Sequence, residues 1–141
     1  MKSAVLDTSG FIPLVIQTPR TDAIRTLAET YGFIAPDLIV AETLNAVRRL
    51  VRAGKFEKAH VENAMNILAA IVDFRPLAPL AKAVPPLMET LDHSAYDCFF
   101  AALALSEGVP LVSGDSVFNR KAAERLPVLP IVDLNQATPT P

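Results

Sequence analysis

The sequence has very few of the residues that build disulfides and zinc sites. Its 141 residues include one cysteine, Cys98, and two histidines, His60 and His93. One cysteine excludes an intramolecular disulfide, and three such residues are too few for a zinc cluster of Cys and His ligands. Cys98 lies in an apolar segment, so we expect a buried thiol. The lack of disulfides fits a reducing cytosol, and we expect a cytoplasmic location.

Long hydrophobic runs and an excess of positive charge are also lacking. The chain starts with one lysine and a short apolar segment that Asp7 interrupts. This is typical neither of a secretory signal nor of a membrane span, so we expect no membrane association. Lysines and arginines number 13 against 15 aspartates and glutamates, which gives a net charge of −2. Binding to nucleic acid would therefore need a local basic patch.

Several common catalytic motifs are absent as well. The sequence has no Walker lysine loop, no Gly-x-Gly-x-x-Gly and no Gly-x-Ser-x-Gly nucleophile turn. A phospho-aspartyl enzyme of the haloacid-dehalogenase type would need an aspartate two residues after Asp7, where the chain has Ser9. These absences argue against nucleotide-binding loops, serine hydrolases and aspartyl-phosphate chemistry.

The composition is that of one globular domain. Hydrophobic residues make up 51% of the chain and charged residues 20%, which are ordinary proportions for a folded protein. The length suffices for a hydrophobic core without disulfides or metals. With no internal repeat and no Gly/Ser linker, we predict a single domain over residues 1–135 and a disordered tail over residues 136–141.

Short apolar segments alternate with helical patterns along the whole chain. We predict strands at residues 4–6, 33–35, 110–113 and 128–132, with a strand or connector at 73–79. Helices are predicted at 11–16, 21–31, 38–53, 55–72, within 80–91, at 95–106 and at 117–125. Such alternation indicates an α/β/α sandwich around a mostly parallel central sheet.

Several residues mark the expected ends of these helices. Gly32 is expected to stop the helix 21–31, and Gly54 and Gly108 to stop two later ones. Asp37 and Ser94 are expected N-caps. The pair Pro85-Pro86 should break or delay the helix within 80–91.

Acidic residues beside apolar segments are the main chemical signal. Asp7 and Asp115 each follow a predicted strand, and ligands bind beyond the carboxyl ends of parallel strands, so these two should lie together. Asp97 opens a long apolar helix, and Glu42 lies on the helix 38–53. Buried carboxylates are costly unless a cation compensates them, and a hard divalent metal ion does so well.

Each acid also has a simpler structural interpretation. Asp7 suits a helix N-cap and Asp115 an ordinary turn. Asp97 is three residues after Ser94, the spacing of a capping box, and His93 is interpreted as a residue at the start of that helix.

Glu42 has its own alternative, a solvated helix face. It shares a polar stripe with Asn45, Arg49 and Arg52, with Arg48 beside them, opposite an apolar arc formed by Ile39, Val40, Leu44, Ala46, Val47, Leu50 and Val51. Periodicity does not separate an exposed stripe from one that faces a site.

The order and context of these acids resemble the PIN-domain nucleases, and within them the VapC toxins of bacterial and archaeal toxin–antitoxin pairs. The matching segments are residues 5–9 (VLDTS), 36–45 (PDLIVAETLN), 96–104 (YDCFFAALA) and 111–118 (LVSGDSVF). They span nearly the whole chain in family order. The departures are Ser113, where a threonine is commoner, Gly114 after it, and the Pro85-Pro86 pair. None of these removes a carboxylate.

The resemblance implies a PIN-like fold and a Mg²⁺- or Mn²⁺-dependent endoribonuclease. Asp7 and Asp97 would be the principal metal ligands and catalytic residues, with Glu42 and Asp115 completing the acidic pocket. Thr8 and Ser113 would place hydroxyls beside it. Asn119 could add a polar contact, and RNA phosphates could be held by Arg48, Arg49, Arg52, Arg120 and Lys121.

The resemblance also implies partners. Members of this family are usually homodimers that a small antitoxin protein neutralises by covering the site. Two alternatives remain at this point. The chain could be a non-catalytic α/β binding module whose acids are caps and surface charge. It could also be a nuclease or phosphatase that acts on a substrate other than RNA.

Overall fold

The computed structural model describes residues 1–136, which contain a five-stranded sheet in the order β3-β2-β1-β4-β5. Every neighbouring pair of strands is parallel, so the predicted mostly parallel sheet is confirmed. The strands are β1 (Lys2–Leu6), β2 (Tyr31–Pro36), β3 (Val72–Arg75), β4 (Leu111–Ser113) and β5 (Ile131–Asp133).

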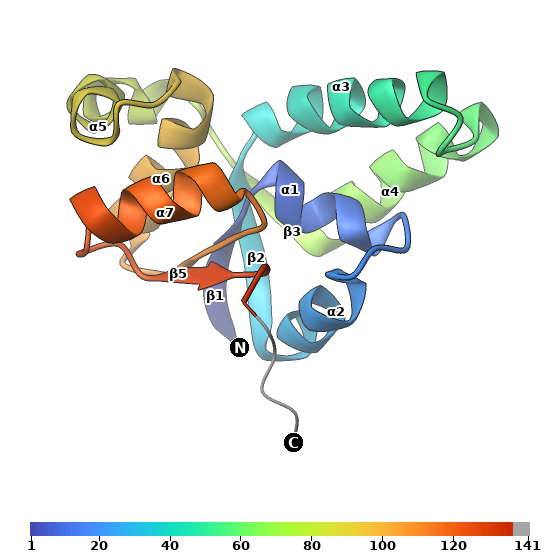
Figure 1. Ribbon diagram of the computed structural model, residues 1–141, viewed down its shortest axis with the longest axis horizontal. Coiled ribbons are helices and arrows are strands. Elements are labelled where there is room, and N and C mark those ends of the chain that lie inside the picture. Colours follow the sequence, from blue (N-terminus) through green and yellow to red (C-terminus); the bar gives the residue numbers. More distant parts are fainter. Residues whose placement is uncertain (137–141) are drawn as a thin grey trace.

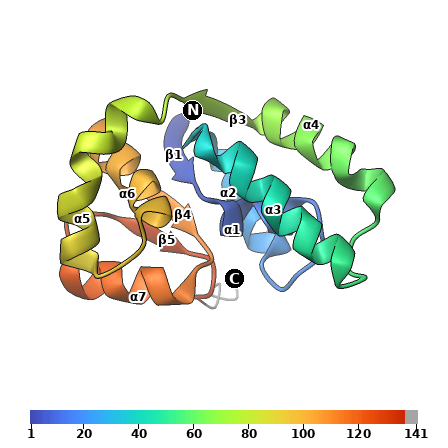
Figure 2. The same cartoon turned by 90° about the horizontal axis from the view of Figure 1, so that it is seen from above.

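Helices cover both sides of this sheet, which confirms the α/β/α sandwich. They are α1 (Thr8–Phe11), α2 (Thr21–Thr30), α3 (Leu38–Arg52), α4 (Val61–Ile71), α5 (Val84–Leu91), α6 (Ala95–Glu107) and α7 (Ser116–Arg125). Short 3-10 helices form at Ile12–Leu14, Lys58–His60 and Ala78–Ala83. Helices α1 to α4 lie on one side and α5 to α7 on the other (Figures 1 and 2).

The chain order explains this division. The chain runs outward from β1 to β2 and β3, then returns across the sheet to β4 and continues to β5. Right-handed crossovers place the helices of the two halves on opposite faces. The direction reverses between β1 and β4, which makes the carboxyl ends of these two strands the topological switch point, where α/β sheets bind their ligands.

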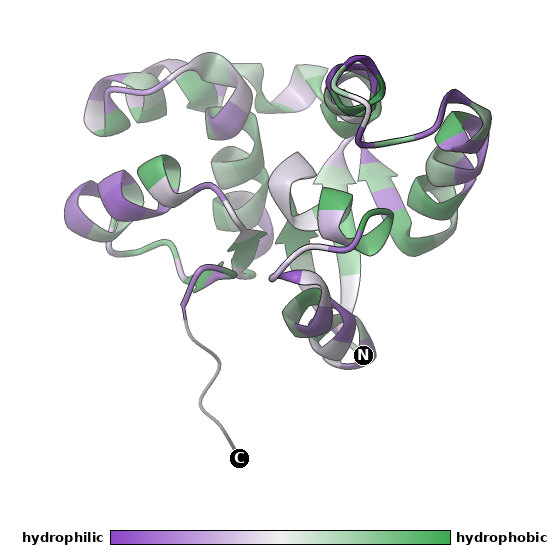
Figure 3. Cartoon of the chain, turned by 45° about the vertical axis from the view of Figure 1, so that its right-hand side comes forward, coloured by the Kyte–Doolittle hydropathy of each residue, from purple (hydrophilic) through white to green (hydrophobic). Residues whose placement is uncertain are grey.

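The core is packed between the central strands and the helices that cover them. Strand β1 is completely buried at Ala4, Val5 and Leu6, because helices cover a central parallel strand on both faces. Such a strand has a continuous run of apolar residues. Helix α6 packs on β1, β2 and β4. The strands are coloured mostly white to green, and along the outer helices hydrophilic residues alternate with hydrophobic ones (Figure 3).

Several predicted element boundaries are wrong. The expected helix 55–72 is a 3-10 turn followed by α4, and Val72 already belongs to β3. Gly32 does not stop α2, which ends at Thr30, and instead lies inside β2. The last strand begins at Ile131, and Val128 is 72% exposed. At Gly32, Val72 and Ile131 the boundary is set by sheet pairing, a long-range interaction.

The expected caps also need correction. In the part of the chain that the structure describes, Asp37 and Ser94 occupy N-cap positions but make no side-chain capping hydrogen bond. Pro85 and Pro86 lie in the first turn of α5, where a missing N–H group costs little. Gly54 and Gly108 adopt the left-handed backbone conformation expected of residues that follow a helix.

The sequence predicts a disordered tail over residues 136–141. Residues 137–141 of that tail lie outside the described residues, and Gln136 donates a backbone hydrogen bond to the carbonyl of Asp133 (3.1 Å). Across residues 1–136, none of the helices combines the length and the hydrophobicity that a membrane crossing would need.

Gly10 lets α1 pack directly against β1 and β4, and this contact is testable. A Cβ atom at Gly10 would lie 2.6 Å from Leu6 Cδ1 and 3.3 Å from the Val112 carbonyl oxygen. Gly10→Ala should therefore lower the free energy of unfolding by about 1–3 kcal/mol in chemical denaturation. Gly32→Ala is the control, since its nearest contact would be 3.9 Å away at Met1 Sδ. Equal stabilities of the two variants would contradict this packing.

Candidate metal and active site

One pocket collects all four acids at the switch point of the sheet. Asp7 follows β1, Asp115 follows β4, Glu42 lies on α3 and Asp97 on the first turn of α6. The pocket has a volume of about 260 Å³ and is lined by Asp7, Thr8, Ser9, Ile12, Glu42, Ala46, Arg49, Asp97 and Asp115. Four segments that are distant in sequence thus bring their carboxylates to one place.

Asp7 is the most buried of these carboxylates, with 6% of its surface exposed. Its Oδ1 accepts hydrogen bonds from the Gly10 N–H (2.9 Å) and from Ser9 Oγ (2.6 Å). Asp7 is therefore the N-cap of α1 and also part of the acidic pocket. Burial raises the pKa of Asp7 from 3.8 to about 6, hydrogen bonds from Ser113, Ser9 and Gly10 oppose the rise, and the charge of Asp97 adds to it.

Glu42 points toward the acids rather than along a solvated stripe. Its Oε1 accepts a hydrogen bond from Thr8 Oγ1 (3.2 Å). Burial raises the pKa of Glu42 from 4.5 to about 7, although the bond from Thr8 opposes the rise, and the charges of Asp97 and Asp7 add to it. Periodicity left two orientations of α3 open, and burial decides between them. Thr43 is buried, whereas Leu44, on the predicted apolar arc, is 44% exposed. The face that carries Glu42 is therefore turned toward the pocket.

Asp97 is held by a histidine and not by a capping box. Its Oδ2 lies 2.5 Å from His93 Nε2, and the predicted cap from Ser94 is not made within residues 1–136. Burial raises the pKa of Asp97, the hydrogen bond from His93 lowers it, and the charge of Asp115 raises it.

Asp115 is the N-cap of α7 and is hydrogen-bonded to the strand before it. Its Oδ1 accepts from the Phe118 N–H (3.1 Å), and its own N–H donates to Ser113 Oγ (3.1 Å). Asn119 is buried and donates from Nδ2 to the Ser113 carbonyl (3.1 Å). Ser113 and Asn119 thus support the backbone that carries Asp115.

Sequence reasoning missed the role of Ser9. Its hydroxyl donates to Asp7 and accepts from the Gly114 N–H (2.8 Å), so one side chain joins the loop after β1 to the loop after β4. The signal was its position two residues after Asp7, a spacing at which a serine hydroxyl can reach the carboxylate.

Sequence reasoning also missed His93. Within the described chain, His93, Asp97 and Asp115 can each present one ligand atom, all within 4.8 Å of one another. The spacing of four residues between His93 and Asp97 was visible, but His93 lies outside the helix, where helical periodicity gives no information.

The predicted basic residues separate into three locations. Arg49 lines the acidic pocket. Arg48 and Arg52 line a different, mainly apolar groove of about 740 Å³ between α3 and α4. Lys121 donates from Nζ to the Asp92 carbonyl (2.5 Å), and Arg120 is exposed on α7.

The residues of the acidic pocket fit a hard divalent cation. Their donors are carboxylate and hydroxyl oxygens with one imidazole nearby, and such oxygen ligands suit Mg²⁺ and Mn²⁺. The raised pKa values of Asp7, Glu42 and Asp97 show that negative charge is costly here. A bound cation would offset that cost, with Asp97, Asp115, Asp7 and Glu42 as the available ligands.

Comparison with solved structures finds the same fold in other proteins. PAE2754 from Pyrobaculum aerophilum aligns with a TM-score of 0.67 and 19% identity, over 85% of this chain and 84% of that chain. VapBC2 from Rickettsia felis, bound to a DNA fragment from its promoter, aligns with a TM-score of 0.64 and 15% identity, over 92% and 97%. A toxin–antitoxin complex from Klebsiella pneumoniae aligns with a TM-score of 0.69 and 15% identity, over 94% and 98%.

Sequence comparison points to a family as well. A comparison of the sequence with curated proteins finds no match. The family model described as the PIN domain matches residues 4–124, which include Asp7, Glu42, Asp97 and Asp115. Since this match covers most of the chain, and strands β2, β3 and β4 and the acidic pocket lie within it, the protein belongs to the PIN-domain family.

Proposed function

We propose that this protein is a metal-dependent endoribonuclease and the toxin of a toxin–antitoxin pair. The observation that carries the proposal is the acidic pocket, in which four carboxylates from four segments face one another. Membership of the PIN-domain family supports a nuclease. Two structural neighbours are toxin–antitoxin proteins, which supports an antitoxin partner. The homodimer is proposed from the family resemblance alone.

Different residues of the pocket would have different roles in phosphodiester hydrolysis. When bound, Mg²⁺ or Mn²⁺ supplies a Lewis acid and a water of lowered pKa. Asp97, Asp115, Asp7 and Glu42 would hold the cation, and Thr8 and Ser9 orient Glu42 and Asp7 through their hydroxyls. Arg49 lines the same pocket and can bind a phosphate oxygen.

Cleavage assays test the proposed activity directly. Asp97→Asn should reduce Mn²⁺-stimulated cleavage of single-stranded RNA by about 100-fold or more, because a loss of roughly 3 kcal/mol of transition-state stabilisation has that effect. Asp22→Asn is the control, since Asp22 is exposed on α2. Preferential cleavage of single-stranded DNA or of p-nitrophenyl phosphate would instead favour another substrate. Absence of any metal-stimulated cleavage would favour a binding module.

The raised pKa of Asp7 predicts a stability effect in the metal-free protein. A carboxyl whose pKa is raised by folding favours the folded state below its unfolded value, here 3.8, and this contribution is lost as pH rises through about 6. Asp7→Asn keeps an acceptor for the Gly10 N–H and removes the charge. In EDTA at pH 8 the Tm of Asp7→Asn should exceed that of the wild type by about 3 °C or more, and the difference in Tm should be smaller at pH 5. A lower Tm of the variant at pH 8 would contradict this prediction.

Two arginines on α3 provide a matched test of RNA binding. Arg49 lines the acidic pocket, whereas Arg52 lines the groove between α3 and α4. Arg49→Ala should weaken binding of single-stranded RNA about tenfold, since a charge-assisted hydrogen bond is worth roughly 1.5–3 kcal/mol. The same substitution should reduce the steepness of the plot of log K against log[salt] by about 0.7. Arg52→Ala should have the smaller effect, and the reverse order would contradict the orientation assigned to α3.

A further inference from the structure

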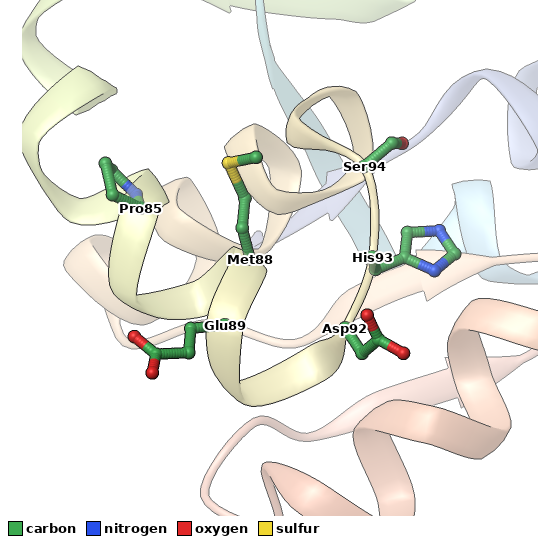
Figure 4. Close-up of a pocket in the computed structure, with 6 residues that line it drawn as sticks. All are labelled: Pro85, Met88, Glu89, Asp92, His93 and Ser94. Carbon is green, nitrogen blue, oxygen red and sulfur yellow. The ribbon is translucent and has the colours of Figure 1, made fainter.

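His93 lies on the loop between α5 and α6, at the edge of the acidic pocket. Its ring extends from this loop away from Met88 and Glu89 of α5 (Figure 4). Only 13% of its side chain is exposed. The ring packs edge-on against Phe118, with centroids 5.3 Å apart and an interplanar angle of 69°. A histidine packed in this way has a fixed position.

Helix α7 fixes the backbone beneath His93. Lys121 donates from Nζ to the Asp92 carbonyl (2.5 Å), and Arg125 donates to the Leu91 carbonyl (3.3 Å). Asp92 adopts the left-handed conformation with φ 47°, and the His93 N–H donates to the Met88 carbonyl (3.3 Å). The basic side chains of α7 therefore hold the loop against the helix that Asp115 caps.

Both ring nitrogens of His93 have polar neighbours, and these decide the tautomer. Nδ1 lies 3.4 Å from Lys121 Nζ, and Nε2 lies 2.5 Å from Asp97 Oδ2. A lysine ammonium can only donate hydrogen bonds. In the neutral ring Nδ1 therefore accepts from Lys121, the ring hydrogen lies on Nε2, and Nε2 donates to Asp97. Histidine tautomers are commonly set by the partner of the other nitrogen in this way.

This arrangement opposes direct binding of a cation by His93. An imidazole binds a cation through a nitrogen lone pair, and Nε2 is the nitrogen that faces Asp97 and Asp115. Freeing its lone pair would move the hydrogen to Nδ1, where it would face the donor Lys121. Donation to Asp97 Oδ2 instead uses one carboxylate oxygen and leaves Oδ1 for the cation.

We propose that His93 is a positioning residue that orients the Asp97 carboxylate for cation binding, with Lys121 fixing its tautomer. The inference rests on the proposed function, because it requires a cation in the acidic pocket. Groups that orient metal ligands through hydrogen bonds typically change metal affinity by about 10- to 100-fold when they are removed.

Mn²⁺ binding without RNA tests this role. His93→Leu should weaken Mn²⁺ binding about 10- to 100-fold in isothermal titration calorimetry. His93→Gln should restore most of the affinity, since its amide N–H can reach the place of Nε2. His60→Leu is the matched control, because the His60 side chain is 64% exposed and distant in sequence. Circular dichroism would verify that each variant folds.

The wild-type protein provides a second measurement that needs no variant. Electron spin-echo envelope modulation of the Mn²⁺ complex should show no directly coordinated ¹⁴N. A directly coordinated nitrogen would overturn the positioning role and make His93 a ligand. Equal Mn²⁺ affinity of the wild type and His93→Leu would also overturn it, while leaving the proposed function intact. A wild type that binds no Mn²⁺ would overturn both.

Discussion

The cost of placing four carboxylates in one half-buried pocket is the constraint on which the rest of the site depends. Burial and mutual repulsion raise the pKa of Asp7 to about 6 and that of Glu42 to about 7. The fold holds the carboxylates together although their burial and proximity oppose ionisation of the carboxyl groups. Such an arrangement is favourable once a divalent cation binds. The cost of ionising these carboxyl groups in the metal-free pocket is therefore the physical basis of the proposed activity.

Small polar groups position the carboxylates in advance. Ser9 joins the loops after β1 and β4, Thr8 orients Glu42, and His93 contacts Asp97. Asp7 and Asp115 also cap the helices that follow them, so the same atoms that serve the pocket stabilise local structure. Preorganisation of this kind reduces the cost of arranging ligands when the cation arrives.

The two acids at strand ends were the part of the site that could be predicted from topology alone. Asp7 and Asp115 follow apolar strands, and parallel topology alone brings them together. Periodicity could not place Glu42, because a helical stripe has the same period whether it faces solvent or a pocket. Only the resemblance to the PIN-domain nucleases assigned Glu42 and Asp97 to the acidic pocket. His93 was missed because its contact with Asp97 depends on how α7 holds a loop, which is a tertiary interaction. Likewise, the ends of α2, α4 and β5 are set by sheet pairing and not by local residues.

The central claim is that the carboxylates at the β1–β4 switch point form a divalent-cation site. Anomalous diffraction from a crystal soaked in Mn²⁺ tests it most directly. The account predicts a peak within coordination distance of Asp97 and at least one further carboxylate among Asp7, Glu42 and Asp115. A soaked crystal with Mn²⁺ bound elsewhere and no peak in this pocket would contradict it.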